Sequence, residues 1–225
     1  MAGPRQFGLV IFDCDGVLVD SEMLSAGVLM AMMEEEGLPI TAEIFRSDFL
    51  GRSFASASAR AALRFGRPLP DGFEQSYRQR LLARMEEQLQ PMDGVAQVLS
   101  SLRAPFCLAT GSSPIRLSVS LRTTGLAGYF AGRTFDVSQV ASGKPAPDLF
   151  LLAASRMGFA PRDCLVIEDS EMGVRAGLCA GMAVWHFAGG AHVKAGYRLP
   201  EDVVPQAAVA SMAALLGAFR QIGLC

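Results

Sequence analysis

The most informative stretch of the sequence is Phe7-Gly-Leu-Val-Ile-Phe12, followed directly by Asp13-Cys-Asp-Gly16. A short continuous apolar run bounded by a turn is typical of a strand buried on both faces of a parallel sheet. The run ends abruptly in polar residues, and Gly16 allows the backbone to turn sharply away. The stretch therefore predicts a buried strand that presents two carboxylates at its carboxyl end.

Three later segments repeat this pattern of an apolar run that ends in polar or glycine residues. They are Phe106-Cys-Leu-Ala109 before Thr110-Gly-Ser-Ser113, Cys164-Leu-Val-Ile167 before Glu168-Asp-Ser170, and Met182-Ala-Val-Trp-His-Phe187 before Gly189-Gly190. Helical patterns cover residues 94–102, 115–124, 148–157 and 171–180. Alternating strands and helices predict an α/β fold with a Rossmann-like, doubly wound parallel sheet. Ligands of such sheets bind in the crevice beyond the carboxyl ends of the strands.

The segment 21–90 interrupts this alternation. Its apolar periodicity predicts consecutive amphipathic helices over residues 22–36, 41–50, 53–65 and 71–89, each stopped by a glycine or proline. We therefore expect an α/β core domain formed by residues 1–20 and 91–225, with an all-helical domain of residues 21–90 inserted. The two connections, near 17–21 and 91–94, are the expected hinges.

Length and composition narrow the class of protein. The chain has 225 residues and a net charge of −2, and its basic residues are scattered. No basic stripe is available to neutralise nucleic-acid phosphates, and no apolar run reaches the length of about 20 residues that spans a bilayer. We expect no nucleic acid or membrane partner, a cytoplasmic location, and a monomer or homodimer.

The acidic residues at the strand ends indicate a metal site. Asp13 and Asp15 lie two residues apart on an extended segment, and Glu168 and Asp169 end a second buried strand. Carboxylates gathered in one crevice repel each other unless a cation lies between them, and Mg²⁺ binds one or two carboxylates together with water and substrate phosphate. Lys144, held in a loop stiffened by two prolines, supplies a further positive charge.

A phosphate-binding loop is expected after the second apolar run. Thr110 offers a hydroxyl, Gly111 and Ser112 offer backbone N–H groups, and Pro114 is suited to the first position of a helix. Because the carboxyl ends of parallel strands share one edge, this loop should lie beside the acidic residues.

Together these residues resemble, in order and spacing, the four signature motifs of the haloacid dehalogenase superfamily. The motifs are Asp13-Cys-Asp-Gly-Val-Leu-Val-Asp-Ser-Glu22, Thr110, Lys144 within Gly-Lys-Pro-Ala-Pro-Asp, and Glu168-Asp169. The chain is most similar to the subgroup of β-phosphoglucomutases, phosphoglycolate phosphatases and sugar phosphatases, and segment 21–90 resembles their helical cap. The resemblance implies a Mg²⁺-dependent phosphoric monoester hydrolase that acts on a small phosphorylated metabolite.

The resemblance also implies a role for each motif residue. Asp13 is the expected nucleophile, Asp15 the general acid and base, and Thr110 and Lys144 hold the phosphoryl oxygens. The expected Mg²⁺ ligands are Asp13, the main-chain carbonyl of Asp15 and Asp169, with Glu168 orienting a metal-bound water. Asp15 favours phosphate esters over haloacids, because the family's dehalogenases lack an acid at that position.

Three functions remain open. Family mutases carry a histidine twelve residues after the nucleophile, where this chain has Ser25, which favours a phosphatase over a phosphomutase. A non-catalytic binding relative is the third possibility. Within the cap, Glu22, Gly51 and Arg52 either contact the substrate or serve as ordinary helix-end and surface residues. His192 could line the mouth of the crevice.

Overall fold

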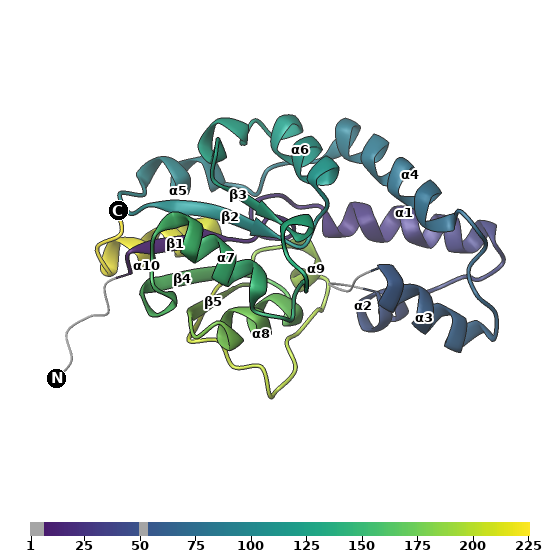
Figure 1. The fold of residues 1–225 in the computed structure, drawn as a ribbon. Coiled ribbons are helices and arrows are strands. Elements are labelled where there is room, and N and C mark those ends of the chain that lie inside the picture. The colour runs from purple at the N-terminus through teal and green to yellow at the C-terminus, as the bar shows by residue number, and fades with distance from the viewer. Residues whose placement is uncertain (1–6, 50–53) are drawn as a thin grey trace.

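The computed structural model describes residues 7–49 and 54–225, and its centre is a six-stranded parallel sheet with the strand order β3-β2-β1-β4-β5-β6 (Figure 1). The strands are β1 (Leu9–Phe12), β2 (Phe106–Thr110), β3 (Thr134–Asp136), β4 (Cys164–Glu168), β5 (Ala183–Phe187) and β6 (Ala207–Val209). From β1 the chain builds outward to β2 and β3, then crosses to β4 on the other side of β1. The predicted doubly wound sheet is confirmed, and the reversal of strand order lies beside β1.

Strand β1 is fully buried because it has a neighbour on each side and helices on both faces. Phe12 pairs with Leu108 of β2 and with Ile167 of β4. Directly after it, the Asp13 N–H donates to the Ile167 carbonyl at 3.0 Å. This register fixes the position of Asp13, the residue after β1, relative to the ends of β2 and β4.

Two hydrophobic clusters cover the faces of the sheet, and successive strand residues alternate between them. Val10 and Phe12 belong to the cluster with α5 (Val95–Ser101), α6 (Pro114–Thr123) and α10 (Met212–Gln221). Leu9 and Ile11 belong to the cluster with α7 (Asp148–Met157) and α8 (Glu171–Cys179). The remaining short elements are α9 (Ala191–Lys194) and 3₁₀ turns at Ala127–Phe130, Val137–Gln139 and Pro161–Asp163.

The four helices expected between β1 and β2 are present, to one side of the sheet (Figure 1). They are α1 (Glu22–Glu35), α2 (Ala42–Asp48), α3 (Phe54–Phe65) and α4 (Phe73–Gln88). A third hydrophobic cluster lies among them and includes Met33, Phe45 and Phe73. The helix ends expected at Leu50 and Ser53 fall outside the described residues. The carboxyl-terminal part of α4, by contrast, packs into the first cluster of the sheet.

The segments that lead into α1 and out of α4 run side by side. The Asp20 N–H donates to the Gln90 carbonyl at 3.2 Å, and the Met92 N–H donates to the Leu18 carbonyl at 2.8 Å. Val19 and Pro91 form the antiparallel bridge between them. The expected hinge segments therefore form one hydrogen-bonded ribbon; whether it bends stays a prediction.

No helix within residues 7–49 and 54–225 combines the length and apolar character that crossing a membrane requires.

Candidate active site

The predicted site residues meet at the carboxyl edge of the sheet. Asp13 follows β1, Thr110 is the last residue of β2, and Glu168 is the last residue of β4, with Asp169 directly after it. All four side chains belong to buried residues. The sheet thus brings together residues separated by more than 90 positions in the sequence, because its three central strands end at one edge.

Lys144 links the first and third of these strand ends. Its Nζ donates to Asp13 Oδ1 at 2.6 Å, to Glu168 Oε1 at 2.7 Å and to the Ala109 carbonyl at 3.2 Å. The ammonium also lies over the Phe150 ring, 4.8 Å from its centroid. All three N–H bonds of the ammonium are therefore used, and its charge is fixed between two carboxylates.

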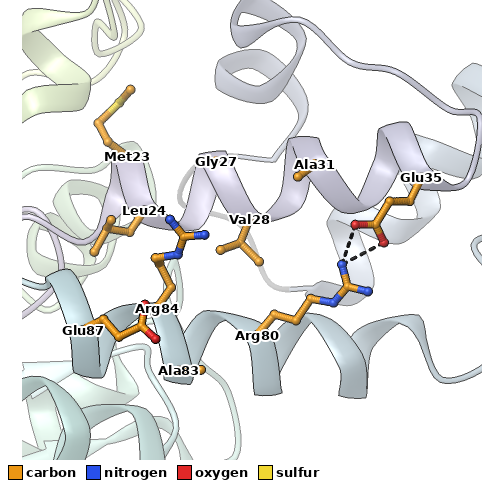
Figure 2. Close-up of a pocket in the computed structure, with 10 residues that line it drawn as sticks. All are labelled: Met23, Leu24, Gly27, Val28, Ala31, Glu35, Arg80, Ala83, Arg84 and Glu87. Atoms are coloured by element: carbon orange, nitrogen blue, oxygen red, sulfur yellow. Dashed lines mark hydrogen bonds and ion pairs between the residues drawn. The ribbon is translucent and has the colours of Figure 1, made fainter.

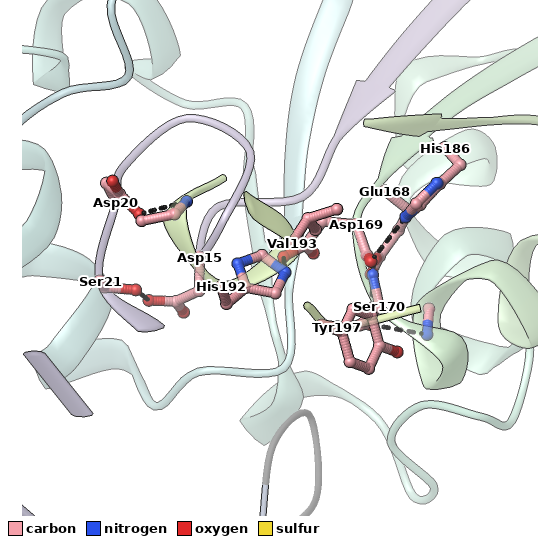
Figure 3. A network of polar contacts seen from close by, with 12 residues as sticks. Asp15, Asp20, Ser21, Glu168, Asp169, Ser170, His186, His192, Val193 and Tyr197 are labelled. Atoms are coloured by element: carbon pink, nitrogen blue, oxygen red, sulfur yellow. Dashed lines mark hydrogen bonds and ion pairs between the residues drawn. The ribbon is translucent and has the colours of Figure 1, made fainter. Parts of the chain in front are cut away.

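The other carboxylate contacts orient Glu168 and Asp169 (Figure 3). Glu168 Oε2 accepts from the Ser170 N–H at 2.8 Å and from the Ser170 hydroxyl at 3.0 Å. His192 Nε2 lies 3.0 Å from Asp169 Oδ2, and His186 Nε2 lies 3.0 Å from the Asp169 carbonyl. Burial lowers the pKa of both imidazoles, so they are neutral at pH 7 and each contact is a hydrogen bond.

Two glycines leave the space that these carboxylates occupy. A Cβ at Gly16, whose φ is +78°, would lie 1.8 Å from Asp169 Oδ2. A Cβ at Gly173, in the first turn of α8, would lie 1.6 Å from Glu168 Oε1. Neither position can carry a side chain unless the carboxylate beside it moves.

The arrangement fits a divalent cation. Oxygen atoms of Asp13, Glu168 and Asp169 lie within 4.8 Å of one another, and Lys144 compensates only one of the three negative charges. Burial, together with the neighbouring carboxylates, raises the pKa of Asp13 and of Asp169 well above the ordinary range. An oxygen-lined, buried and over-charged cluster is the donor set that Mg²⁺ prefers.

Glu168 differs from the other two carboxylates. Burial acts to raise its pKa, but the Lys144 ammonium and the hydrogen bonds from Ser170 outweigh burial, so the pKa is lowered. For Lys144, burial acts to lower the pKa, and the two carboxylates outweigh it, so the net shift is upward. Glu168 and Lys144 therefore form a charged pair, while Asp13 and Asp169 are the two carboxylic acids whose ionisation is opposed until a further cation lies beside them.

Asp15 has a separate set of partners. Its Oδ1 accepts from the Ser21 hydroxyl at 2.5 Å and from Arg116 Nη2 at 2.8 Å, and its Oδ2 accepts from the Ser112 hydroxyl at 2.5 Å. Burial acts to raise the pKa of Asp15, but the Arg116 guanidinium and the two hydroxyls outweigh it, so the pKa is lowered. The general acid and base expected from the sequence is thus held as a carboxylate.

The expected phosphate-binding loop begins α6 as predicted. The Ser113 hydroxyl caps the helix by accepting from the Arg116 N–H, and Pro114 is the first helical residue. The Ser112 N–H donates to Thr110 Oγ1 at 3.1 Å, and Gly111 has open space where a side chain would be. The loop lies beside Asp15 through the Ser112 hydroxyl.

The substrate contacts expected from the helical insertion are Glu22, Gly51 and Arg52. Glu22 is partly buried at the start of α1, and burial raises its pKa while Arg116 acts to lower it. Gly51 and Arg52 fall outside the described residues.

Two neighbours of the site were not expected from the sequence. Arg116 contacts Asp15 across 101 positions, and His192, expected at most at the crevice mouth, is buried against Asp169. The position of Arg116 two residues after Pro114 could have placed it near the loop, and Gly189-Gly190 before His192 is the signal that suggested the crevice mouth.

A separate groove of about 580 Å³ lies on the helical insertion (Figure 2). Its walls come from α1 and α4, and Arg80 Nη1 closes one end by bonding both carboxylate oxygens of Glu35, at 2.7 and 2.8 Å. None of the strand-end residues lines it. This groove is therefore separate from the cluster of strand-end residues.

Residues 7–181 match the family described as haloacid dehalogenase-like hydrolase. The chain belongs to the haloacid dehalogenase-like hydrolases. This confirms the family expected from the four motifs, and the matched residues include every motif residue from Asp13 to Asp169.

Solved structures of the family share the whole fold. A conserved haloacid dehalogenase-like protein from Agrobacterium tumefaciens strain C58 has a TM-score of 0.84 and 32% identity, covering 96% of this chain and 99% of its own. A family hydrolase from Deinococcus radiodurans R1, solved with bound phosphate and sodium, has a TM-score of 0.80 and 32% identity, covering 98% of each chain.

A curated relative with a named activity is the 6-phosphogluconate phosphatase of Escherichia coli K12. It is 28% identical over 186 residues, which are 82% of this chain and 84% of the relative. The phosphorylated carbohydrates phosphatase of Thermotoga maritima is 31% identical over 177 residues, which are 77% of this chain and 81% of the relative. The expected enzyme class is thereby confirmed: the chain is a phosphoric monoester hydrolase of this family.

Proposed function

We propose that this haloacid dehalogenase-like hydrolase is a Mg²⁺-dependent phosphatase that forms an aspartyl-phosphate on Asp13. The observation that carries the proposal is the bridge of Lys144 between Asp13 and Glu168, inside a cluster of carboxylates that fits a divalent cation. The expected substrate is a small phosphorylated metabolite of the sugar phosphate, phosphogluconate or phosphoglycolate type. Relatives named as phosphatases of 6-phosphogluconate and of phosphorylated carbohydrates support that class.

The reaction consists of two displacements at phosphorus. In the first, Asp15 accepts the proton of the bound monoester anion, an Asp13 carboxylate oxygen bonds to phosphorus, the bond to the ester oxygen breaks, and Asp15 passes its proton to the leaving oxygen. In the second, Asp15 takes a proton from water, the water oxygen bonds to phosphorus, the bond to Asp13 breaks, and the proton leaves Asp15 with the phosphate product. One ester and one water become one alcohol and one phosphate, and both carboxyl groups return to their starting states.

The remaining residues bind and orient the phosphoryl group. Lys144 and the Thr110 hydroxyl are placed at the strand ends beside Asp13, and the backbone N–H groups of Gly111 and Ser112 begin the loop before α6. To bind phosphate, the Ser112 N–H would have to leave its present acceptor, Thr110 Oγ1. Asp13, the Asp15 carbonyl and Asp169 would hold Mg²⁺, with Glu168 orienting a water. The ion would neutralise charge on the phosphoryl oxygens, and positioning and electrostatics do most of the work in such transfers.

We further propose that residues 21–90 act as a cap over residues 1–20 and 91–225. Glu22 at the start of α1 would contact the part of the substrate that is not phosphate, and Gly51 and Arg52 stay candidates for the same role. A phosphatase is favoured over a phosphomutase because the position of the mutase histidine holds Ser25, whose hydroxyl lies 3.3 Å from Arg116 Nη2. The expected cytoplasmic location and the monomeric or homodimeric state stay predictions.

Phosphate release from a panel of small phosphate esters, with added Mg²⁺ and with a chelator, tests this function. We expect release that requires Mg²⁺ and a preference for sugar phosphates or phosphorylated sugar acids. Interconversion of phosphate isomers without release would favour the mutase. Neither release nor interconversion with any ester would favour the non-catalytic binding relative.

The nucleophile is tested by Asp13→Asn, with Asp71→Asn at an exposed position as the control. Asp13→Asn should abolish turnover with an unchanged circular dichroism spectrum, while Asp71→Asn keeps full activity. In the wild type, mass spectrometry after acid quench should find a phosphoryl group on the peptide that contains Asp13. Turnover by Asp13→Asn contradicts the covalent route.

A further inference from the structure

Arg116 is a charged residue of the α/β core that takes part in neither of the two displacements described above. It is the third residue of α6, immediately after the phosphate-binding loop. Its Nη2 lies 2.8 Å from Asp15 Oδ1, 3.4 Å from Ser21 Oγ and 3.3 Å from Ser25 Oγ. One guanidinium nitrogen therefore contacts the acid, the segment leading out of the core, and the first helix of the insertion.

Three side chains donate hydrogen bonds to Asp15, and Arg116 is the charged one. The other two bonds come from the hydroxyls of Ser21 and Ser112, which can rotate and can also accept hydrogen bonds. A guanidinium has fixed, planar donors and always carries its charge, so it sets the direction of a carboxylate more firmly than a hydroxyl does. Asp15 is thus oriented mainly by Arg116.

The Nε donor of Arg116 is a second reason to connect the placement of this side chain with Asp15. This Nε is buried and has no hydrogen-bond partner within residues 7–49 and 54–225. An N–H group left without a partner is unfavourable, and it persists only where other contacts of the same group outweigh it. Here those contacts are the ion pair with Asp15 and the two serine hydroxyls.

We propose that Arg116 is a positioning residue that holds the Asp15 carboxyl group in place for its proton transfers. The proposal rests on the proposed phosphatase function. Arg116 acts through Asp15 and does not touch the phosphoryl group. Its contact with Ser25 extends the same set of hydrogen bonds to α1, so the acid is anchored from both sides of the crevice.

The leaving group of the substrate distinguishes this role from others. An alkoxide needs a proton as it leaves, whereas p-nitrophenolate is a stable anion and needs none. In Arg116→Met, kcat/KM for the best alkyl phosphate of the panel should fall by about 100-fold or more. For p-nitrophenyl phosphate the fall in kcat/KM should be no more than about tenfold, and Arg116→Lys should recover part of the loss on the alkyl ester.

A double-mutant cycle with Asp15→Asn gives an independent readout. If Arg116 acts through Asp15, Arg116→Met should cost almost nothing further on the alkyl ester once Asp15 has been replaced. Arg122→Met is the matched control, because Arg122 lies on the same helix and its exposed guanidinium pairs with Glu86. That variant should match the wild type on both esters.

Several results overturn the proposal. Equal losses on both esters indicate a general structural defect, and a raised KM with kcat unchanged indicates that Arg116 binds substrate. Additive losses in the double-mutant cycle also exclude action through Asp15. If Arg116→Met does not fold, Arg116→Gln and Arg116→Lys are compared on the same two esters and judged in the same way. Absence of phosphate release by the wild type refutes the proposed function itself and Arg116's role with it, so the two failures are distinguishable.

Discussion

Asp13 and Asp15 stand two residues apart at the end of one strand, yet their carboxylates pair with different cations. Asp13 Oδ1 is 2.6 Å from Lys144 Nζ, and Asp15 Oδ1 is 2.8 Å from Arg116 Nη2. The pKa of Asp13 is raised, mainly by burial, and the pKa of Asp15 is lowered, because Arg116 and two hydroxyls outweigh burial. Two neighbouring carboxylates are thus given different environments, and a cation bound beside Asp13 would lower the pKa of that nucleophile.

Removal of the Lys144 ammonium should destabilise the protein. In Lys144→Met, three buried carboxylates lose their one compensating charge, and breaking a buried pair in this way costs about 3–5 kcal/mol of the free energy of unfolding. Urea denaturation measures the loss, and saturating Mg²⁺ should recover part of it. The control is Lys194→Met, since Lys194 is the chain's other lysine and is exposed. Equal stability of the two variants contradicts the predicted charge balance.

Gly173→Ala should impair catalysis although it adds a good helix former. The new Cβ would lie 1.6 Å from Glu168 Oε1, so the carboxylate must move away from Lys144. We expect at least a tenfold rise in the Mg²⁺ concentration needed for half-maximal activity, as for other residues that orient metal ligands. Gly217→Ala in α10 meets no atom of the described part of the chain within 4 Å and should instead stabilise the protein by up to about 1 kcal/mol, with unchanged activity. Normal activation of Gly173→Ala by Mg²⁺ would mean that Glu168 has no part in the metal site.

His192→Ala should weaken Mg²⁺ activation more than it lowers the maximal rate. The His192 imidazole donates to Asp169 Oδ2 at 3.0 Å, and loss of such a hydrogen bond to a metal ligand typically costs 10–100-fold in metal affinity. Titration of activity with Mg²⁺ gives the apparent affinity. Lys194→Met, on the same short helix, should leave it unchanged. An unaltered Mg²⁺ titration for His192→Ala shows that Asp169 does not depend on this contact.

Stabilisation by Mg²⁺ should decline as the pH falls. In the metal-free protein the pKa values of Asp13 and Asp169 lie above their ordinary value of 3.8, mainly because of burial. Between the ordinary and the raised values the folded state binds more protons than the unfolded state, so acidification favours the metal-free fold through these two groups. Mg²⁺ requires the deprotonated carboxylates and therefore competes with those protons.

The measurement is the difference in melting temperature with and without Mg²⁺, taken from about pH 7.5 down to about pH 5. The two histidines titrate in both samples, so the difference largely removes their contribution. We expect the difference to shrink steadily with acidification. A difference that stays constant or grows would show that these carboxylates are not the ones that bind Mg²⁺.

The central strands and the residues at their ends were predictable because burial on both faces leaves a continuous apolar run. Asp13, Thr110 and Glu168 follow such runs, and parallel strands bring their carboxyl ends to one edge. Strands β3 and β6 were not predicted. Each has three residues, Thr134–Asp136 and Ala207–Val209, and such short edge strands carry no apolar run that differs from a loop.

The hydrogen-bond partners of the site residues were harder to predict from the sequence than the site residues themselves. Ser112 was expected to offer its backbone N–H to phosphate, and the donation of its hydroxyl to Asp15 across 97 positions was not predicted. The contact of Arg116 with Asp15 depends on how α6 leaves the loop and on the space beside Ser25. Such contacts follow from side-chain direction in the packed structure, which no local pattern encodes.

The hydrogen-bonded ribbon at Val19 and Pro91 has a consequence for how this enzyme can change over time. The chain leaves the sheet and returns to it at adjacent points, so the register of β1 and β2 depends on the two ends of the insertion and not on its length or contents. Changes in α2 and α3 can therefore accumulate while the catalytic edge stays intact, whereas α1 and α4 are tied to the core through Ser25 and through the apolar carboxyl-terminal part of α4. New substrate preferences can arise in one part of the gene at little risk to the chemistry encoded on either side of it.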